Sequence, residues 1–213
     1  NSHPLNITAG IDGNLWFVEY AGNKIGRITT SGVVTEFNLL TNSYLYNIAT
    51  GIDGNLWFTE GTANKIGRIT PSGVVTEFNV PTAQSGLNGI TAGPDGNLWF
   101  TESLGNKIGR ITTDGTIAEF DIPTVAAKLI NITVGQDGNL WFTEHDGNKI
   151  GRITPSGVVT EFNLPTANSQ PYAISLGPDD NVWFTELGGK RIGRITTDGI
   201  ITEFNISTST AVG

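Results

Sequence analysis

The chain of 213 residues contains no cysteine and no methionine. Without cysteine, it forms no disulfide and offers no thiolate for catalysis or metal binding. Only 15% of its residues are charged, no apolar run approaches the length of a membrane-spanning helix, and no basic cluster is present. Together with a net charge of −8 at pH 7, these absences predict no binding to nucleic acid and no insertion into a membrane.

The chain begins Asn1-Ser2-His3 and shows no signal peptide. Because it lacks methionine, it has no encoded start. We therefore expect a processed or excised piece of a longer product, for which an extracellular or periplasmic location is favoured.

One seven-residue motif occurs five times. GNLWFVE at Gly13–Glu19 returns as GNLWFTE at Gly54–Glu60, Gly96–Glu102 and Gly138–Glu144, and as DNVWFTE at Asp180–Glu186. The tryptophans of successive copies are 41 or 42 residues apart, and the chain has no others. A fixed period of this size indicates a solenoid, a propeller or an array.

Within a repeat, four short apolar stretches alternate with turn residues. In the third repeat we expect strands at 88–93, 97–102, 107–112 and 116–122, separated by sequences such as Asp95-Gly96 that favour tight turns. The adjacent large side chains of Leu98, Trp99 and Phe100 require both faces of their strand to be covered. Radially stacked antiparallel sheets meet that requirement.

The sequence therefore predicts an all-β fold, a β-propeller of five four-stranded antiparallel blades. We expect one domain over residues 1–213, with blades near 4–40, 45–82, 87–124, 129–166 and 171–207. Five blades either close into a ring or form an arc of a larger propeller. We favour the closed ring, because the chain starts on a first strand and ends on a fourth.

Repeated charges have structural explanations. An arginine recurs on each third strand and a glutamate on each fourth, and we expect one Arg–Glu pair in every blade. The arginines are Arg27, Arg68, Arg110, Arg152 and Arg194, and the glutamates are Glu36, Glu77, Glu119, Glu161 and Glu203.

A second series of glutamates ends each second strand, where the strand meets a loop at one mouth of the channel. Such carboxylates either accept hydrogen bonds from the following turn or form a ring that attracts a divalent cation. They are Glu19, Glu60, Glu102, Glu144 and Glu186.

Positions that differ between repeats are the better guide to a binding site. All four tyrosines of the chain fall at variable positions near the same mouth, and Asn88 occupies one of these positions. The predicted ligand-binding residues are Tyr20, Tyr44, Tyr46, Asn88 and Tyr172. Aromatic rings at a mouth favour stacking on a sugar or an aromatic ligand.

His145 follows Glu144, with which it could pair, and these two residues are the candidates for acid–base catalysis.

The motifs GxDGNLWFTE, NKIGRIT and GxxTEFxxP resemble the virginiamycin B lyase (streptogramin lyase) family of propellers over residues 4–206. The resemblance implies a seven-bladed, magnesium-dependent enzyme that opens the ester of type B streptogramins by elimination. It also implies catalytic histidines in a Pro-His-x-Ile setting. In this chain, that histidine position is filled by Leu5, Tyr46, Asn88, Ile130 and Tyr172.

Three hypotheses about function follow. The first is a non-catalytic binding or assembly module that presents a Tyr- and Glu-lined mouth to a small molecule, a glycan or a protein. The second is a magnesium-dependent carbon–oxygen lyase with Glu144 and His145 as its acid and base. The third is a trimmed or amplified repeat scaffold without a function of its own.

Overall fold

The computed structural model describes residues 2–206, and every regular element in that range is a β-strand. The strands form five four-stranded antiparallel sheets, one for each sequence repeat, and each sheet pairs its strands in chain order. The prediction of propeller blades is therefore confirmed. Asn1, together with Ser207 at the end of the predicted last blade and residues 208–213, lies outside the described residues. None of the described segments is a helix long and apolar enough to cross a membrane.

The strand bounds repeat almost unchanged from blade to blade. Blade 1 comprises β1 (Pro4–Ala9), β2 (Leu15–Glu19), β3 (Lys24–Ile28) and β4 (Val34–Asn38). Blade 2 comprises β5 (Leu45–Thr50), β6 (Leu56–Glu60), β7 (Lys65–Ile69) and β8 (Val75–Asn79). Blade 3 comprises β9 (Leu87–Ala92), β10 (Leu98–Glu102), β11 (Lys107–Ile111) and β12 (Ile117–Asp121). Blade 4 comprises β13 (Leu129–Val134), β14 (Leu140–Glu144), β15 (Lys149–Ile153) and β16 (Val159–Asn163). Blade 5 comprises β17 (Pro171–Leu176), β18 (Val182–Glu186), β19 (Arg191–Ile195) and β20 (Ile201–Asn205).

The same local contacts build each blade. In blade 3, Gly96 has a φ of +79°, a left-handed conformation that glycine adopts without strain. The indole N–H of Trp99 donates to the Asp95 carboxylate at 3.0 Å, which joins the turn to the strand. On the other side of β10, the Phe100 ring lies over Gly109 of β11, where a β-carbon would come within 2.1 Å of the ring. The repeated glycine of the third strand therefore makes room for the phenylalanine.

Adjacent blades pack face to face. One face of each sheet carries the tryptophan of its second strand, and the opposite face carries the phenylalanine; we call them the Trp face and the Phe face. Trp99 and Ile108 on the Trp face of blade 3 share a buried cluster with Leu140, Phe142 and Ile153 on the Phe face of blade 4. The Leu-Trp-Phe sequence is thus covered on both sides, as the sequence requires.

The predicted Arg–Glu pair in every blade is wrong. In blade 2, Arg68 is paired across the strands with Thr76. Glu77 is paired with the preceding residue of β7, Gly67. Because successive residues of a strand point to opposite faces, Arg68 and Glu77 lie on different sides of the sheet. Lys65, two residues before Gly67, shares the face of Glu77 and binds its carboxylate at 2.7 Å.

The arginines instead join neighbouring blades. The Arg68 guanidinium lies 5.5 Å from the centroid of the Trp57 ring and donates to the backbone carbonyl of Thr113 in blade 3 at 2.9 Å. The other internal interfaces repeat this bond. The pairs are Arg27 with Pro71, Arg110 with Pro155, and Arg152 with Thr197.

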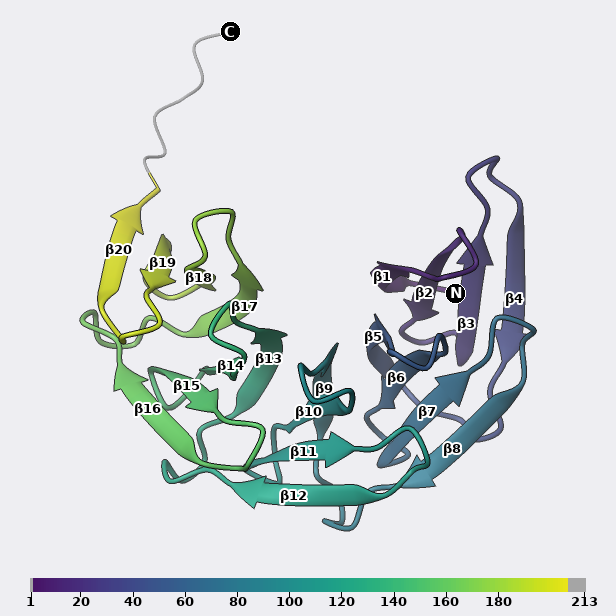
Figure 1. Cartoon of the computed structure of the whole chain (residues 1–213), viewed down its shortest axis with the longest axis horizontal. Helices are drawn as coiled ribbons and strands as arrows, with labels where there is room; N and C mark the ends of the chain where they lie inside the picture. Colours follow the sequence, from purple (N-terminus) through teal and green to yellow (C-terminus); the bar gives the residue numbers. More distant parts are fainter. Residues whose placement is uncertain (1, 207–213) are drawn as a thin grey trace, which may run out of the picture.

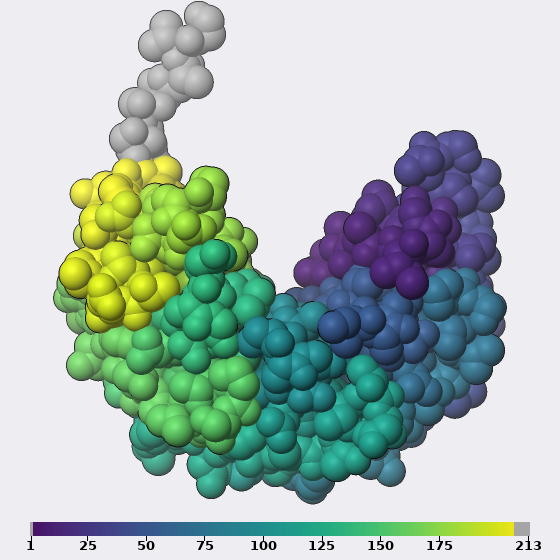
Figure 2. Space-filling view, in the orientation of Figure 1, coloured from purple at the N-terminus to yellow at the C-terminus, as the bar shows by residue number. Residues whose placement is uncertain are grey.

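The five blades form an open arc (Figures 1 and 2). The first strands pack in the order β1, β5, β9, β13 and β17 along the inner side, while the fourth strands form the outer rim. A gap separates blade 1 from blade 5. The expectation of a closed five-bladed ring is therefore wrong. Interlocking side chains set the rotation from one blade to the next, and that rotation is too small for five blades to complete a circle.

Candidate functional site

The predicted tyrosines gather at one end of the inner side of the arc, where the second strands end and the first strands begin; we call this end the mouth. The ring of Tyr20, which follows β2, stacks on the ring of Tyr44, with centroids 4.9 Å apart and an interplanar angle of 8°. Tyr46 of β5 meets Tyr20 edge-on, with centroids 5.3 Å apart. The structure thus brings together three of the four tyrosines from two blades and the linker between them.

A bulge in each first strand lies at the mouth. In blade 2, the pairing of β5 with β6 shifts between Leu45 and Ile48. The N–H of Asn47 donates to the Thr59 hydroxyl at 3.1 Å, and that hydroxyl donates to the carbonyl of Asn88 in blade 3 at 2.7 Å. The bulge takes the side chains at its position out of the regular alternation. In blades 2 to 4, this threonine also ties the bulge to the next blade.

Openings border the tyrosines on two sides. One, of about 250 Å³, is lined by Tyr46, Asn88 and Leu104 among others, and another, of about 350 Å³, lies beside Tyr44. The pKa of Tyr46 is raised, first by burial, and then by a hydrogen bond with Tyr20 and the charges that the other three tyrosines would carry. Tyr46 is therefore a neutral phenol at pH 7, and the predicted residue Asn88 lies next to it.

A second group of side chains lies where blades 4 and 5 meet. The Nδ1 atom of His145 forms a hydrogen bond with the Asp146 carboxylate, and the ring centroid of His145 lies 6.4 Å from that of Tyr172. The Lys128 ammonium is 3.7 Å from the same carboxylate. An imidazole oriented by a carboxylate is the arrangement of a general base. Among residues 2–206, His145 thus pairs with Asp146, and no hydrogen bond links it to Glu144.

The repeated glutamates lie between blades. Glu60, Glu102 and Glu144 are fully buried, and within the described part of the chain none of their carboxylate oxygens has a hydrogen-bond partner. Burial, together with the negative charge of the nearby fourth-strand glutamate, raises the pKa of each to about 8. Glu19 and Glu186 are also buried, and burial raises the pKa of both. The three internal glutamates are mostly protonated at pH 7.

The structure does not bring these glutamates together. Among residues 2–206, no three His, Asp or Glu side chains are placed to hold a metal ion. Magnesium is bound through ionised carboxylates together with other oxygens around one point, whereas these carboxyl groups are buried in separate blades. The donor set therefore does not fit a shared magnesium site at the mouth. A metal-binding role stays a prediction for Glu19, Glu60, Glu102, Glu144 and Glu186.

Sequence reasoning missed three residues at the mouth: Thr62, Leu104 and Asp146. The Thr62 hydroxyl accepts from the backbone N–H of Tyr44 at 3.1 Å, and Asp146 holds His145. Each of the three follows a second-strand glutamate by two residues, at a position that differs in every repeat. That variation is the signal that could have found them, one residue beyond the variable position of Tyr20 and His145.

Comparison with known proteins places this geometry in context. The model of the virginiamycin B lyase family matches residues 1–212. One similar structure is a catalytically inactive variant of virginiamycin B lyase from Staphylococcus aureus, crystallised with quinupristin. It is 47% identical, with a TM-score of 0.94, over 96% of this chain and 70% of that chain. A streptogramin B lyase is 43% identical with a TM-score of 0.94, over 99% of this chain and 71% of that chain. A chain of a nidogen–laminin complex is 15% identical with a TM-score of 0.70, over 95% of this chain and 80% of that chain, and shares the fold alone.

Proposed function

The chain belongs to the virginiamycin B lyase family, and from that premise we propose that it is a binding module whose mouth takes a small aromatic ligand of the streptogramin B type without converting it. The main support for this proposal is the cluster of Tyr20, Tyr44 and Tyr46. Two blades and the linker between them contribute these three rings, which lie in contact at the mouth.

The cluster suits an aromatic ligand because its rings lie in contact with one another and are partly exposed. Tyr44 of the cluster keeps 45% of its surface exposed, so an incoming ring has a free aromatic surface to stack on. Tyrosine also loses little conformational entropy when a ligand binds, since it has only two side-chain torsions. The relative crystallised with quinupristin supports this class of ligand.

Two features support binding without turnover. None of the five bulge positions at the mouth carries an imidazole, because they hold Leu5, Tyr46, Asn88, Ile130 and Tyr172. Glu60, Glu102 and Glu144 are buried and mostly protonated at pH 7, which disfavours them as bases for proton abstraction.

The His145–Asp146 pair favours a second candidate function, a carbon–oxygen lyase. In this reaction, His145 would remove a proton from the carbon next to a carbonyl group while Asp146 holds the ring in place. The electron pair would form a carbon–carbon double bond, and the ester oxygen would leave as a carboxylate, which opens the ring. Magnesium dependence is implied by the family resemblance, and no step here is assigned to the metal.

Quinupristin is the probe that separates these candidates. We expect isothermal titration calorimetry to give saturable binding that weakens in Tyr44→Ala.

Chromatography with and without magnesium should show quinupristin unchanged after long incubation. An elimination product would have the same mass but a different retention time and a new double-bond absorbance. Its appearance, and its loss in His145→Ala, would establish the lyase. Neither binding nor turnover would leave the repeat scaffold as the remaining hypothesis.

A further inference from the structure

The linker between blades 1 and 2 is shorter than the later linkers. It comprises six residues (39–44), and we call it linker 1, whereas the later linkers comprise seven (80–86, 122–128 and 164–170). Two backbone N–H groups anchor linker 1. That of Thr41 donates to the Glu77 carboxylate at 2.9 Å, and that of Ser43 donates to a side-chain oxygen at 2.9 Å. The later linkers keep both anchors but place two residues between them, where linker 1 has only Asn42.

The missing residue changes the backbone around the second anchor. In the later linkers, the residues before and after this anchor are left-handed, with φ between 52° and 68°. They are Gln84 and Gly86, Ala126 and Lys128, and Asn168 and Gln170. Neither Asn42 nor Tyr44, which hold these positions in linker 1, has a positive φ. Tyr44 therefore has a backbone conformation that its counterparts in the later linkers lack.

A backbone carbonyl holds each of the later linkers in place. The carbonyl of Ser85 accepts from the N–H groups of Leu104 and Gly105, both at 2.9 Å. The carbonyls of Ala127 and Ser169 accept from the equivalent pairs of N–H groups. Among the described residues, the Ser43 carbonyl accepts no such bonds. Linker 1 is therefore held in a different way.

Two hydroxyl groups take the place of that carbonyl in linker 1. The Thr62 hydroxyl accepts from the N–H of Tyr44 at 3.1 Å. The hydroxyl of Ser43, a buried residue, accepts from the N–H of Ala63 at 3.1 Å. The two hydroxyl oxygens are themselves hydrogen-bonded at 3.1 Å. No other blade has a hydroxyl at the position of Thr62, where the residues are Ala21, Leu104, Asp146 and Gly188.

These bonds fix Tyr44 against blade 1. Its ring stacks on that of Tyr20, and the N–H of the next residue, Leu45, donates to the Tyr20 carbonyl at 3.1 Å. The counterparts of Tyr44 in the later linkers carry no aromatic ring; they are Gly86, Lys128 and Gln170. The stacked pair is therefore specific to the junction of blades 1 and 2.

We propose that linker 1 determines the ligand specificity of the mouth, with Ser43 and Thr62 as positioning residues that hold Tyr44 against Tyr20. This inference rests on the proposed function, because it concerns the same aromatic site. It confines an aromatic ligand to the junction of blades 1 and 2.

The hollow beside Tyr44 defines what the ligand carries next to its ring. The hollow has a volume of about 350 Å³, and its lining residues are Ala21, Asn42, Ser43, Tyr44 and Thr62. None of these side chains is charged, so the hollow supplies hydrogen bonds but no counter-ion. The ligand class is therefore an aromatic ring that bears a neutral hydrogen-bonding group, such as an amide.

Variants of Thr62 test the positioning role without a ligand. In protein labelled with ¹³C at tyrosine, the four tyrosines give four sets of ring signals in NMR spectra. Thr62→Val should shift the ring signals of Tyr20 and Tyr44, because the rings separate, and Thr62→Ser should keep them in place. Inserting one alanine after Asn42 gives linker 1 the length of the later linkers and should separate the rings as well.

Thr30→Val is the matched control for the loss of a hydroxyl group. Thr30 is exposed in the turn between β3 and β4, at the end of blade 1 opposite to the mouth. This variant should leave all tyrosine signals unchanged.

Titrations test the consequence for binding. The affinity for quinupristin should fall by a factor of about 3 to 10 in Thr62→Val and recover in Thr62→Ser. Benzamide, benzoate and benzamidinium have similar shapes and differ in charge. Followed by the Tyr44 signal, benzamide should bind at least about threefold more tightly than either charged probe.

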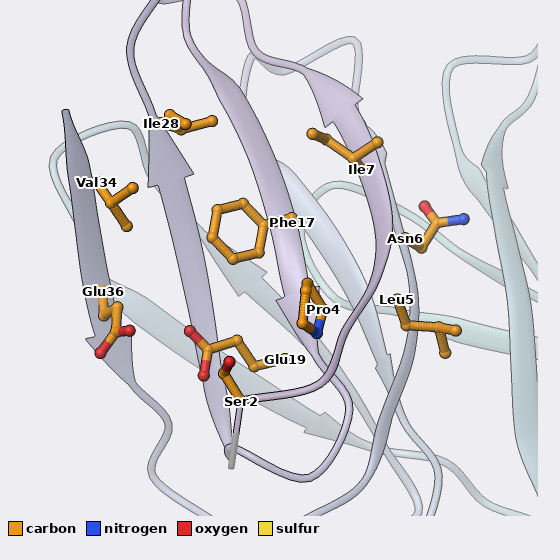
Figure 3. A pocket seen from close by; sticks show the side chains of 10 residues that line it. All are labelled: Ser2, Pro4, Leu5, Asn6, Ile7, Phe17, Glu19, Ile28, Val34 and Glu36. Carbon is orange, nitrogen blue, oxygen red and sulfur yellow. The ribbon is translucent and has the colours of Figure 1, made fainter. Parts of the chain in front are cut away.

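The cavity on the Phe face of blade 1 is a competing place for an aromatic ring. Figure 3 shows Phe17, Ile28 and Val34 side by side along this cavity of about 460 Å³. Benzamide that bound there would leave the Tyr44 signal unchanged and would overturn the proposed specificity.

Two further results would count against the proposal. Unchanged tyrosine signals in both Thr62→Val and the insertion variant would overturn the positioning role. Equal affinity for the three probes would overturn the neutral hydrogen-bonding class. Shifted tyrosine signals in a chain that binds no quinupristin would instead support the positioning role and reject the proposed function.

Discussion

The carboxyl group of Glu144 lies directly against the turn at Gly147, where a β-carbon would come within 2.9 Å of its Oε2 atom. Gly147 covers this carboxyl group at the end of blade 4. The carboxyl group is fully buried, and its pKa is raised to about 8. Glu60 and Glu102 have the same burial and the same raised pKa. At pH 7 the folded chain therefore favours the neutral, protonated form of these three glutamates.

The first prediction is a loss of stability with rising pH. In the unfolded chain these glutamates have an ordinary pKa near 4.5, whereas in the folded chain it is about 8. Their contribution to stability is complete below pH 4.5 and is lost as the pH rises to about 8. Within that window, each lowers the free energy of unfolding by up to about 1.4 kcal/mol per pH unit.

Chemical denaturation at pH 5, 6.5 and 8.5 measures this effect. The combined variant Glu60→Gln, Glu102→Gln and Glu144→Gln should flatten the decline, since an amide does not titrate. A decline of the same slope in that variant would show that other groups cause it. The control is Asp114→Asn, because a hydrogen bond from the Thr112 hydroxyl lowers the pKa of Asp114, which titrates in the acid range.

The second prediction concerns the tyrosine cluster. Tyr20→Ala removes the ring that contacts both Tyr44 and Tyr46. The affinity for quinupristin should fall by a factor of about 3 to 10, as expected for the loss of one aromatic stacking contact. Calorimetric titration checks this. Val125→Ala serves as the control in a linker far from the cluster and should bind as the unchanged chain does.

The third prediction tests the close contact inside a blade. A β-carbon at Gly109 would lie 2.1 Å from the Phe100 ring, so Gly109→Ala should lower the free energy of unfolding by about 1–3 kcal/mol. Adding Phe100→Leu should recover part of the loss, because the smaller side chain leaves room for the methyl group. Urea denaturation of Gly109→Ala, Phe100→Leu and the double variant measures both effects. Identical losses in the single and double variants would refute the steric explanation.

The fourth prediction concerns an absent hydroxyl group. In blade 3 the Thr101 hydroxyl accepts from Gly89 N–H and donates to the carbonyl of Ile130, and both contacts are buried. Blade 1 has Val18 at the equivalent position, so no such hydroxyl reaches Tyr46. Val18→Thr should therefore raise the free energy of unfolding by about 1 kcal/mol.

Thermal unfolding checks this prediction, with an expected rise of about 2–4 °C in Tm. The reverse change, Thr101→Val, leaves two buried backbone groups without a partner and should cost about 1–3 kcal/mol. If Val18→Thr is less stable than the original chain, the β1–β5 junction differs from the other blade junctions.

The sequence predicted the blades well, because the period, the turn residues and the Leu-Trp-Phe run all constrain the same meander. The Arg–Glu pairing failed because it ignored strand alternation. Gly67 is the strand partner of Glu77, and Lys65 lies two residues before Gly67, so Lys65 and Glu77 share a face of the sheet. This alternation could have been applied to the sequence. The same rule places Glu60 on the Phe face with Leu56 and Phe58, between blades.

Other features could not be inferred from the repeats. The angle between blades depends on how side chains of two sheets interlock, and identical motifs allow several angles, so the open arc was not predictable. The stacking of Tyr20 on Tyr44 depends on a linker whose path follows from that angle. The variable positions still predicted that tyrosines gather at one end of the blades, where Tyr20, Tyr44 and Tyr46 lie in contact.

The open arc also determines the order in which the blades unfold. A linear series of blades with nearest-neighbour contacts behaves as a chain of coupled units, in which each internal blade is held by two interfaces and each terminal blade by one. Blades 1 and 5 therefore have the lowest local unfolding free energies, and opening spreads inward from both ends toward blade 3. Thermal melting should accordingly be broader than a single two-state transition.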